Sequence, residues 1–160
     1  MKIIVNGASL SGKTALVLYL RDKTDFPIRE IDEELTELNG GEFPVGEDLK
    51  KNILTLKVVK KVIAQDKIIF FTNTDYFTSN NLRDAREKGF KILQLDLALV
   101  DLLERNEYRM KNQGYGDMSQ WLAGMVDYQK KIRDEDLVDT ILDASKPTSE
   151  IAKEIFEIGE

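Results

Sequence analysis

The residues most able to do chemistry lie in the segment Gly7-Ala8-Ser9-Leu10-Ser11-Gly12-Lys13-Thr14. The segment fits the spacing G-x-x-x-x-G-K-[ST], in which the glycines let backbone amides turn inward around phosphate groups. A helix that begins at the end of such a loop adds its positive dipole end to the same anion. We expect Lys13 to reach the β and γ phosphates and the Thr14 hydroxyl to ligate Mg²⁺. The sequence therefore predicts an MgATP site made of these eight residues.

The sequence on either side supplies the context that this loop needs. Ile3-Ile4-Val5 is a β-branched run that ends at Asn6-Gly7, which predicts a strand buried on both faces. Residues 14–20 contain several apolar side chains and no helix breaker, which predicts a helix directly after the loop. A strand, a phosphate-binding loop and a helix are thus expected in succession.

Apolar runs and helical patterns continue to alternate along the chain. Five strands alternating with helices predict an α/β fold, with a mostly parallel sheet between two layers of helices. Ligands of such sheets bind at the carboxyl ends of the strands. Further strands are predicted at 26–31, 67–72, 90–95 and 138–142, and further helices at 46–65, 82–88, 97–111, 118–132 and 149–158.

The amino-acid composition of the chain excludes several kinds of catalysis. Across 160 residues there is no cysteine and no histidine, which excludes thiolate and histidine-based catalysis. The formal net charge of −6 argues against a nucleic-acid partner, whose binding face would be basic. No apolar stretch approaches the length of a membrane span. We expect one cytoplasmic domain over residues 1–160, a monomer or homodimer, with a small phosphate acceptor as its partner.

An acidic segment, Glu30-Ile31-Asp32-Glu33-Glu34, follows the predicted second strand. With the phosphate-binding loop, it makes the chain resemble the nucleotide and shikimate kinase group of the P-loop NTPase superfamily over nearly its whole length. The resemblance implies the P-loop nucleoside triphosphate hydrolase fold, and two acids of which one holds magnesium through water and the other contacts the acceptor. Either Glu30 with Asp32 or Asp32 with Glu34 forms the pair. The alternative is a solvated charge run at a helix start.

The segment Leu95–Arg105 is similar to the fourth strand and following helix of these kinases, where an arginine stands at the base of a lid. Arg109 lies one helical turn beyond Arg105, so both guanidiniums share a face and could offset charge on the transferring phosphate. The alternative is a pair of exposed arginines bridged to Glu104 and Glu107. A short lid is expected around 106–119.

The segment Asp139–Ser145 is similar to the end of the fifth strand in this group, where the adenine ring packs against a loop. The resemblance makes Ala144, Ser145, Lys146 and Pro147 candidates for the base pocket. An ordinary turn with Ser149 as the N-cap of the next helix is compatible with the same residues.

One departure concerns the third strand, after which many P-loop ATPases place an aspartate that supports magnesium. Here Thr72-Asn73-Thr74 follows, and the nearest acid is Asp75, which suits metal support, a basic role toward an acceptor hydroxyl, or a turn cap. Trp121 and Tyr128 are interpreted as packing residues. The segments expected to border the acceptor contain Arg29, Tyr76, Phe77, Arg83 and Arg86.

The main hypothesis is an ATP-dependent kinase for a small metabolite or nucleotide, with Lys13, Asp32, Arg105 and Arg109 as catalytic residues and Thr14 and Asp32 at the metal. Phosphoryl transfer rests on positioning and electrostatics, so the absence of histidine is no obstacle. The alternatives are a nucleotide-binding regulatory protein without kinase activity and a stand-alone ATPase.

Overall fold

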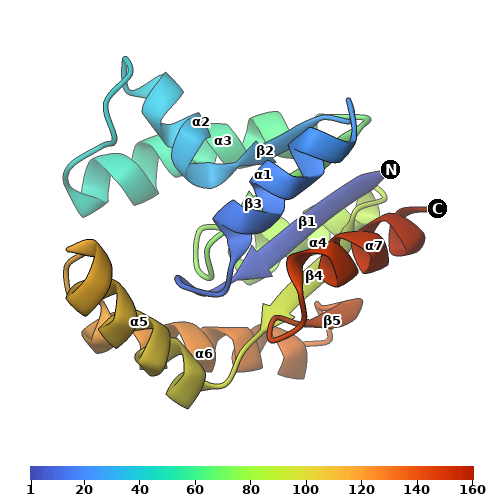
Figure 1. The fold of residues 1–160 in the computed structure, drawn as a ribbon. Coiled ribbons are helices and arrows are strands. Elements are labelled where there is room, and N and C mark those ends of the chain that lie inside the picture. The colour runs from blue at the N-terminus through green and yellow to red at the C-terminus, as the bar shows by residue number, and fades with distance from the viewer.

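The computed structural model describes residues 1–160 and contains one five-stranded parallel sheet in the order β2-β3-β1-β4-β5. β1 lies at the centre, paired with β3 on one side and β4 on the other (Figure 1). The sheet confirms the α/β prediction. The strands are β1 Lys2–Gly7, β2 Ile28–Glu30, β3 Ile68–Thr72, β4 Lys91–Asp96 and β5 Thr140–Asp143.

Helices connect successive strands and cover both faces of the sheet (Figure 1). Their arrangement matches the predicted three layers. The α-helices are α1 Lys13–Lys23, α2 Ile31–Leu38, α3 Thr55–Ile63, α4 Ser79–Glu87, α5 Leu99–Gln113, α6 Ser119–Asp134 and α7 Thr148–Gly159, and a π-helix, η1, spans Asp48–Leu54. None of the helices combines the length and apolar character that crossing a bilayer requires.

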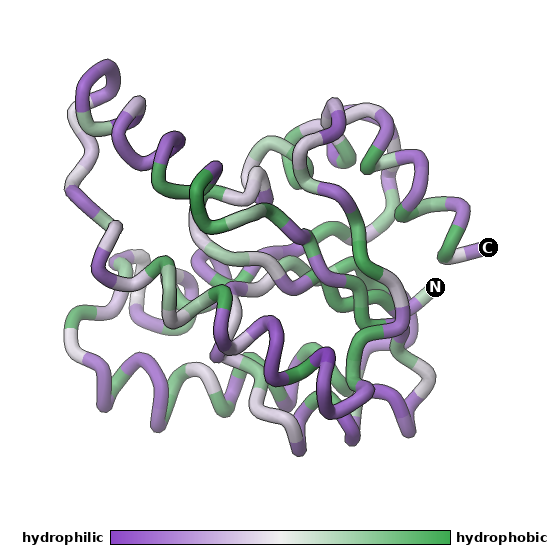
Figure 2. Tube along the Cα trace, turned by 90° about the horizontal axis from the view of Figure 1, so that it is seen from below, coloured by the Kyte–Doolittle hydropathy of each residue, from purple (hydrophilic) through white to green (hydrophobic).

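The side chains of β1 show why the sheet must be covered on both faces. Ile3 and Val5 belong to one buried apolar cluster, with residues from α1, α5, α6 and α7. Ile4 points the other way, into a second cluster built mainly on α2, α3 and α4. In Figure 2 the hydrophobic segments gather toward the centre of the molecule, and the outer helices alternate along their length.

The predicted helix 46–65 is divided into η1 and α3. The Thr55 amide donates to the carbonyl of Lys50, five residues earlier, which is the hydrogen bond of a π-turn. In the sequence, a helical spacing is followed by Leu49, Ile53, Leu56, Val59, Lys60 and Ile63, which predicts one continuous face. The wider turn rotates the residues that follow it, so this prediction is wrong over the first half. Leu49, Ile53 and Leu56 are exposed, whereas Leu54, Thr55, Val58, Val59, Val62 and Ile63 are buried.

The helix before the predicted lid also differs from the expected one. α5 continues to Gln113 and ends at Gly114, whose φ of 69° suits a glycine C-cap. Residues 106–113 of the expected lid are therefore helical, and only 114–118 form a loop before α6. The elements that meet at the carboxyl edge of the sheet are this loop, the loop after β1 and the start of α2.

Candidate active site

The loop between β1 and α1 has the conformation that its glycines permit. Gly12 takes a φ of 98°, in the left-handed region that favours glycine, and α1 begins at the next residue. At Gly7 an added Cβ would lie 2.6 Å from the Ser11 Oγ atom and 3.2 Å from Leu95. A side chain at Gly7 would therefore displace the loop from Ser11 and Leu95, and the other end of the loop lies at the amino end of α1, which favours an anion.

Lys13 occupies the centre of this loop. Its Nζ atom donates hydrogen bonds of 2.7 Å to the carbonyls of Gly7 and Ala8. Desolvation lowers the pKa of Lys13 to about 8, while the negative charges of Asp32 and Glu30 act in the opposite direction. A lysine with this pKa, at the amino end of α1, is suited to bind an anion that restores its full charge.

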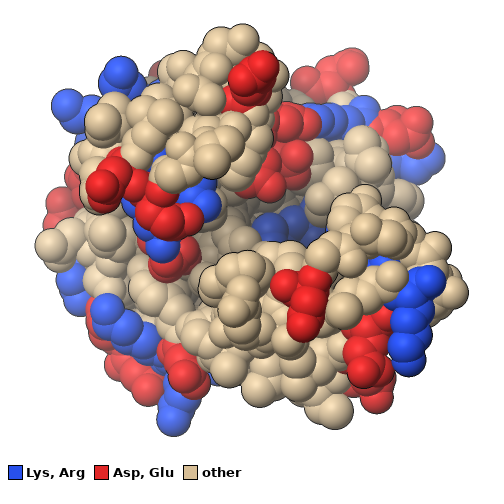
Figure 3. All heavy atoms as spheres, turned by 90° about the vertical axis from the view of Figure 1, so that its left-hand side faces the viewer, with Lys and Arg blue, Asp and Glu red and all other residues tan.

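A cleft of about 650 Å³ opens in front of the loop. In Figure 3 basic atoms lie at the floor of the hollow and acidic side chains surround it. Its volume falls within the range of ordinary small-ligand sites. We call it the first cleft; its walls include residues from the loop, the start of α2 and α5, among them Gly12, Lys13, Thr14, Asp32, Arg105 and Arg109.

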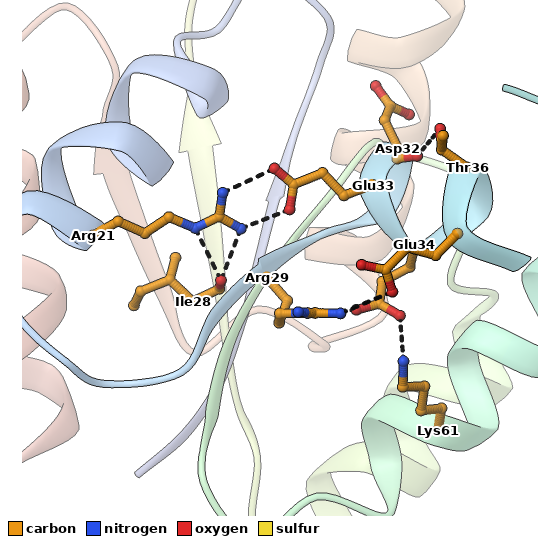
Figure 4. Close-up of polar contacts among 9 residues, drawn as sticks. Arg21, Ile28, Arg29, Asp32, Glu33, Glu34, Thr36 and Lys61 are labelled. Atoms are coloured by element: carbon orange, nitrogen blue, oxygen red, sulfur yellow. Dashed lines mark hydrogen bonds and ion pairs between the residues drawn. The ribbon is translucent and has the colours of Figure 1, made fainter. Parts of the chain in front are cut away.

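Of the acidic residues around α2, the two that line the first cleft are Glu30 and Asp32. Glu33 is bonded to both terminal nitrogens of Arg21, at 2.8 and 2.6 Å. Figure 4 shows the Asp32 carboxylate standing apart from these pairs, with only its backbone carbonyl bonded to Thr36.

Glu34, the other candidate partner of Asp32, points away from the cleft. Its side chain is 3% exposed and accepts from Arg29 at 2.6 Å and from Lys61 at 2.7 Å (Figure 4). Glu30, and not Glu34, therefore lines the cleft with Asp32, which favours the first of the two pairs; the roles of the two acids stay a prediction.

Burial raises the pKa of Asp32, against the opposing charges of Lys13 and Lys50, and burial also raises the pKa of Glu30. No three acidic side chains gather into a metal cage. Mg²⁺ in nucleotide sites is usually held by one or two protein oxygens together with water and phosphates. Thr14 and Asp32 line the same cleft and supply a hydroxyl and a carboxylate, so the residues present fit such an ion.

Arg105 and Arg109 both face the first cleft, as their spacing predicts. Arg105 is fixed: its Nη1 atom donates to the Leu10 carbonyl at 2.9 Å and its Nη2 atom to the Ala144 carbonyl at 3.4 Å. Arg109 instead stacks on Tyr115, with its guanidinium carbon 3.8 Å from the ring centroid. Neither arginine pairs with Glu104 or Glu107, so one guanidinium is anchored to the loop and the other is held by the lid.

The lid loop itself is held by Asn106, a residue that the sequence did not single out. Asn106 is buried; its amide donates to Asp117 at 2.8 Å and its carbonyl accepts the Met118 amide proton at 2.9 Å. Its position in the sequence, three residues before Arg109, does not indicate this role, because asparagine is common on helix surfaces. Only the fold shows that it joins α5 to the start of α6.

The predicted base-pocket residues lie beside Arg105 but outside the first cleft. Ser145 and Arg105 line a shallow depression, and Ser145 donates to the Asp143 carboxylate at 2.6 Å. Lys146 pairs with Glu154 at 2.7 Å. Whether Ala144–Pro147 contacts a base stays a prediction; their position next to an anchored arginine is compatible with it.

The segment after β3 connects the first cleft to a neighbouring one of about 610 Å³, which we call the second cleft. Asn73 lines both clefts, and its side-chain amide donates to the Ser9 hydroxyl at 3.0 Å. Asp75 lines the second cleft and pairs with Lys51 at 2.6 Å. In place of the expected aspartate, an amide thus contacts the phosphate-binding loop.

Most of the expected acceptor residues lie elsewhere. Arg83 pairs with Glu135 at 3.1 Å and Arg86 with Asp139 at 2.9 Å, which joins α4 to the turn before β5. Phe77 is buried in the core, and Arg29 is bound to Glu34. Only Tyr76 lines the second cleft. The prediction that Arg29, Phe77, Arg83 and Arg86 border a cleft is therefore wrong.

Trp121 also departs from its expected packing role, because 52% of its surface is exposed and it lines the second cleft. Lys50 and Lys51 line the same cleft and were not anticipated. Adjacent lysines on a predicted amphipathic helix suggest only a solvated face. The direction of the Lys50 and Lys51 side chains depends on the π-turn and on how it packs.

Comparison with known proteins agrees with this architecture. No protein-family model matches the chain, and no curated protein matches it in sequence. Among solved structures, shikimate kinase from Aquifex aeolicus matches with a TM-score of 0.75 and 20% identity, over 98% of this chain and 95% of that one.

Two further structures show the same likeness. Shikimate kinase from Acinetobacter baumannii, in complex with shikimate, matches with a TM-score of 0.71 and 16% identity, over 98% of this chain and 90% of that one. A gluconokinase from Sinorhizobium meliloti matches with a TM-score of 0.62 and 20% identity, over 96% and 87% of the two chains. The chain therefore has the fold of shikimate kinase, gluconokinase and related small P-loop kinases.

Proposed function

We propose that residues 1–160 form a single kinase domain that transfers the γ-phosphoryl group of MgATP to a hydroxyl of a small metabolite. The observation that carries the proposal is the convergence of Lys13, Asp32, Arg105 and Arg109 on one cleft in front of the phosphate-binding loop. Three cations and one carboxylate around a phosphate cradle are the parts that phosphoryl transfer requires.

Each group has a separate task in this proposal. Lys13 and the loop amides bind the β and γ phosphates, and Arg105 and Arg109 offset the charge that spreads over the transferring group. Thr14 and Asp32 would hold magnesium, which neutralises phosphate charge when it is bound. The bond from the acceptor oxygen to the γ-phosphorus forms, the bond to the bridging oxygen breaks, and ADP leaves with that electron pair while the hydroxyl proton passes to a base or to water.

The proposal is tested by titrating MgATP and MgGTP calorimetrically and then measuring ADP release with candidate acceptors. We expect saturable MgATP binding that Lys13→Ala abolishes. Lys57→Gln is the matched control, because Lys57 lies on the exposed side of α3, outside the first cleft. Unchanged ATP affinity in Lys13→Ala would overturn the assignment.

A second function is favoured by one observation, the amide of Asn73 where P-loop ATPases often have a carboxylate. A chain that binds MgATP but transfers nothing would be a nucleotide-dependent regulator. Burst and steady-state measurements of ADP release, with every acceptor that binds, separate the two functions. Binding without release in all of them would favour the regulator.

A further inference from the structure

Two surface grooves lie outside the first and second clefts and share no residue with them. One, of about 520 Å³, runs between α3 and α4; we call it the basic groove, because three lysines and one aspartate are its charged residues. The other, of about 410 Å³, follows α5 and the start of α6; we call it the acidic groove, because three acids and one lysine are its charged residues. The basic groove includes Leu56, Lys57 and Lys60, and the acidic groove includes Val100, Leu103, Glu104 and Glu107.

Four charged side chains of these grooves have no ionic partner in their own chain. All four are exposed, and none of the ion pairs of the structure includes Lys57, Lys60, Glu104 or Glu107. The two glutamates were candidates to bridge the arginines of α5, and that pairing does not form. The charge of each groove is therefore available to an opposite charge on another molecule.

The helix faces beside the two grooves carry the same pattern of residue types, with the sign of the charges reversed. Each face has two apolar residues three apart, then a charged residue directly after the second, and another charged residue three positions later. Steps of three and four residues keep side chains on one face of a helix. The members are Ile53, Leu56, Lys57 and Lys60 on one face and Val100, Leu103, Glu104 and Glu107 on the other.

The apolar members of both faces are unusually open to water. The exposed fractions are 50% for Ile53, 54% for Leu56 and 61% for Val100. Single exposed apolar side chains are ordinary, but here they adjoin one another and a groove. Covering them with apolar side chains of another molecule would remove this area from water, which is favourable.

A second copy of the chain offers each groove its complement. When α3 of one copy lies parallel to α5 of another, apolar residues face apolar residues and the two lysines come beside the two glutamates. Within one molecule, α3 and α5 pack on opposite faces of the sheet, against different apolar clusters (Figure 1). Each molecule can therefore use both grooves at the same time, with two different neighbours.

We propose that this protein self-associates head to tail, with the basic groove of one copy docked on the acidic groove of the next. Because the contact joins two different surfaces, it builds a chain of copies, or a ring if the rotation between copies closes. Two short helix faces bury much less than the roughly 1,600 Å² of a standard stable interface, so the association is weak and reversible. The inference does not depend on the proposed kinase function, since both grooves lie outside the clefts.

Sedimentation equilibrium of the full chain, from about 0.01 to 1 mM protein, tests the association. At an ionic strength of about 0.1 M the Debye length is about 10 Å, so the repulsion between chains of net charge −6 is screened more than a direct contact is. We expect the weight-average mass to rise above the monomer value of 18.3 kDa as the concentration increases. A mass that stays at the monomer value up to 1 mM would overturn the proposal.

Charge reversal connects the association to the grooves. One variant carries Lys57→Glu with Lys60→Glu, and the other carries Glu104→Lys with Glu107→Lys. Each variant alone should associate at least about tenfold more weakly than the wild type, because two attractive pairs become repulsive. An equimolar mixture of the two variants should associate again, since each reversed groove then meets a reversed partner and each unchanged groove meets an unchanged one.

The controls separate this contact from net charge and from misfolding. Lys67→Glu with Lys130→Glu makes the same change of net charge at exposed lysines outside both grooves, and should associate as the wild type does. Glu104→Lys with Glu107→Lys makes the chain less negative, so an effect of net charge alone would strengthen its association instead of weakening it. Recovery in the mixture shows that both variants are folded. Wild-type association in either groove variant alone, or a mixture that stays monomeric while the wild type associates, would overturn the assignment of the grooves.

Discussion

Arg109 lies over the ring of Tyr115, with its guanidinium carbon 3.8 Å from the centre of the ring. The two residues come from opposite sides of Gly114, where α5 ends, so the contact fixes the lid loop and the arginine together. Tyr115→Leu is expected to weaken MgATP binding two- to fivefold, because an exposed cation–π contact contributes about 0.5–1 kcal/mol. Tyr115→Phe keeps the ring and should behave as wild type in the same calorimetric titration; a loss in both variants would point to the hydroxyl instead.

The lowered pKa of Lys13 predicts that MgATP binding is coupled to proton uptake. Its pKa is about 8 in the free protein, below the usual lysine value, so much of it is neutral at pH 9. Bound phosphates favour the charged form, hence MgATP binding should take up close to one proton at pH 9 and almost none at pH 7. Calorimetry in buffers of different ionisation enthalpy measures this number. Equal uptake at both pH values would contradict the lowered pKa.

Asp32 and its neighbour in the sequence, Glu33, provide a test variant and its control. Asp32→Asn should raise the Mg²⁺ concentration needed for half-maximal ATP binding at least about tenfold, since a charge-assisted contact contributes about 1.5–3 kcal/mol. Glu33→Gln, which breaks only the exposed pair with Arg21, should leave it unchanged.

The pH dependence of the same measurement has a definite sign. Burial raises the pKa of Asp32, so its carboxylate is lost at a higher pH than that of an ordinary aspartate as the solution is acidified. Magnesium-dependent binding should fall with it in the wild type. The same fall in Asp32→Asn would show that another group is responsible.

Gly7 and Gly116 give a test of the loop. Gly7→Ala would place a methyl group 2.6 Å from the Ser11 Oγ atom, so the loop must shift and MgATP affinity should fall at least tenfold, by about 1.4 kcal/mol or more. At Gly116 nothing lies within 4 Å of an added Cβ. Gly116→Ala should therefore bind MgATP normally, and equal affinities in the two variants would argue against a close approach at Gly7.

Glu34 connects β2, α2 and α3 through its two cations. Removing both Arg29 and Lys61, as Arg29→Met with Lys61→Met, leaves a buried carboxylate unpaired and should cost about 3–5 kcal/mol of unfolding free energy. Arg21→Met, at a more exposed pair, should cost about 1 kcal/mol or less.

The pKa of Glu34 is shifted in the opposite direction to that of Asp32. Arg29 and Lys61 hold the pKa of Glu34 below its usual range despite the opposing effect of burial. Its stabilisation is therefore present above the ordinary glutamate pKa and is lost as the pH falls through the folded value. Urea unfolding of the wild type and the double variant should converge in acid; a constant difference would exclude this cause.

The parts of the site that could be predicted are those determined by local sequence. The loop from Gly7 to Thr14 needs only a strand before it and a helix after it, and Arg105 and Arg109 share a face by helical geometry alone. The alternation of strands and helices was sufficient to predict the parallel sheet. Short-range spacing and backbone geometry determine all of these features.

The unpredicted parts depend on contacts between distant segments. Arg83 and Arg86 are paired with Glu135 and Asp139, about fifty residues away in sequence, and no local pattern distinguishes such pairing from exposure to a cleft. The π-turn in η1 changes which side of its helix is buried, and with it the direction of Lys50 and Lys51. A periodicity argument assumes 3.6 residues per turn, so it fails where that number changes.

The two apolar clusters on opposite faces of the sheet have a consequence for how this protein could diversify. The helices α1, α5 and α7 rest mainly on one cluster, and α2, α3 and α4 rest on the other. Substitutions that repack the second cluster can move η1 and its lysines while the β1 loop keeps its support. Under the proposed kinase function, a change of acceptor would therefore not require a change in the loop that binds the phosphate donor.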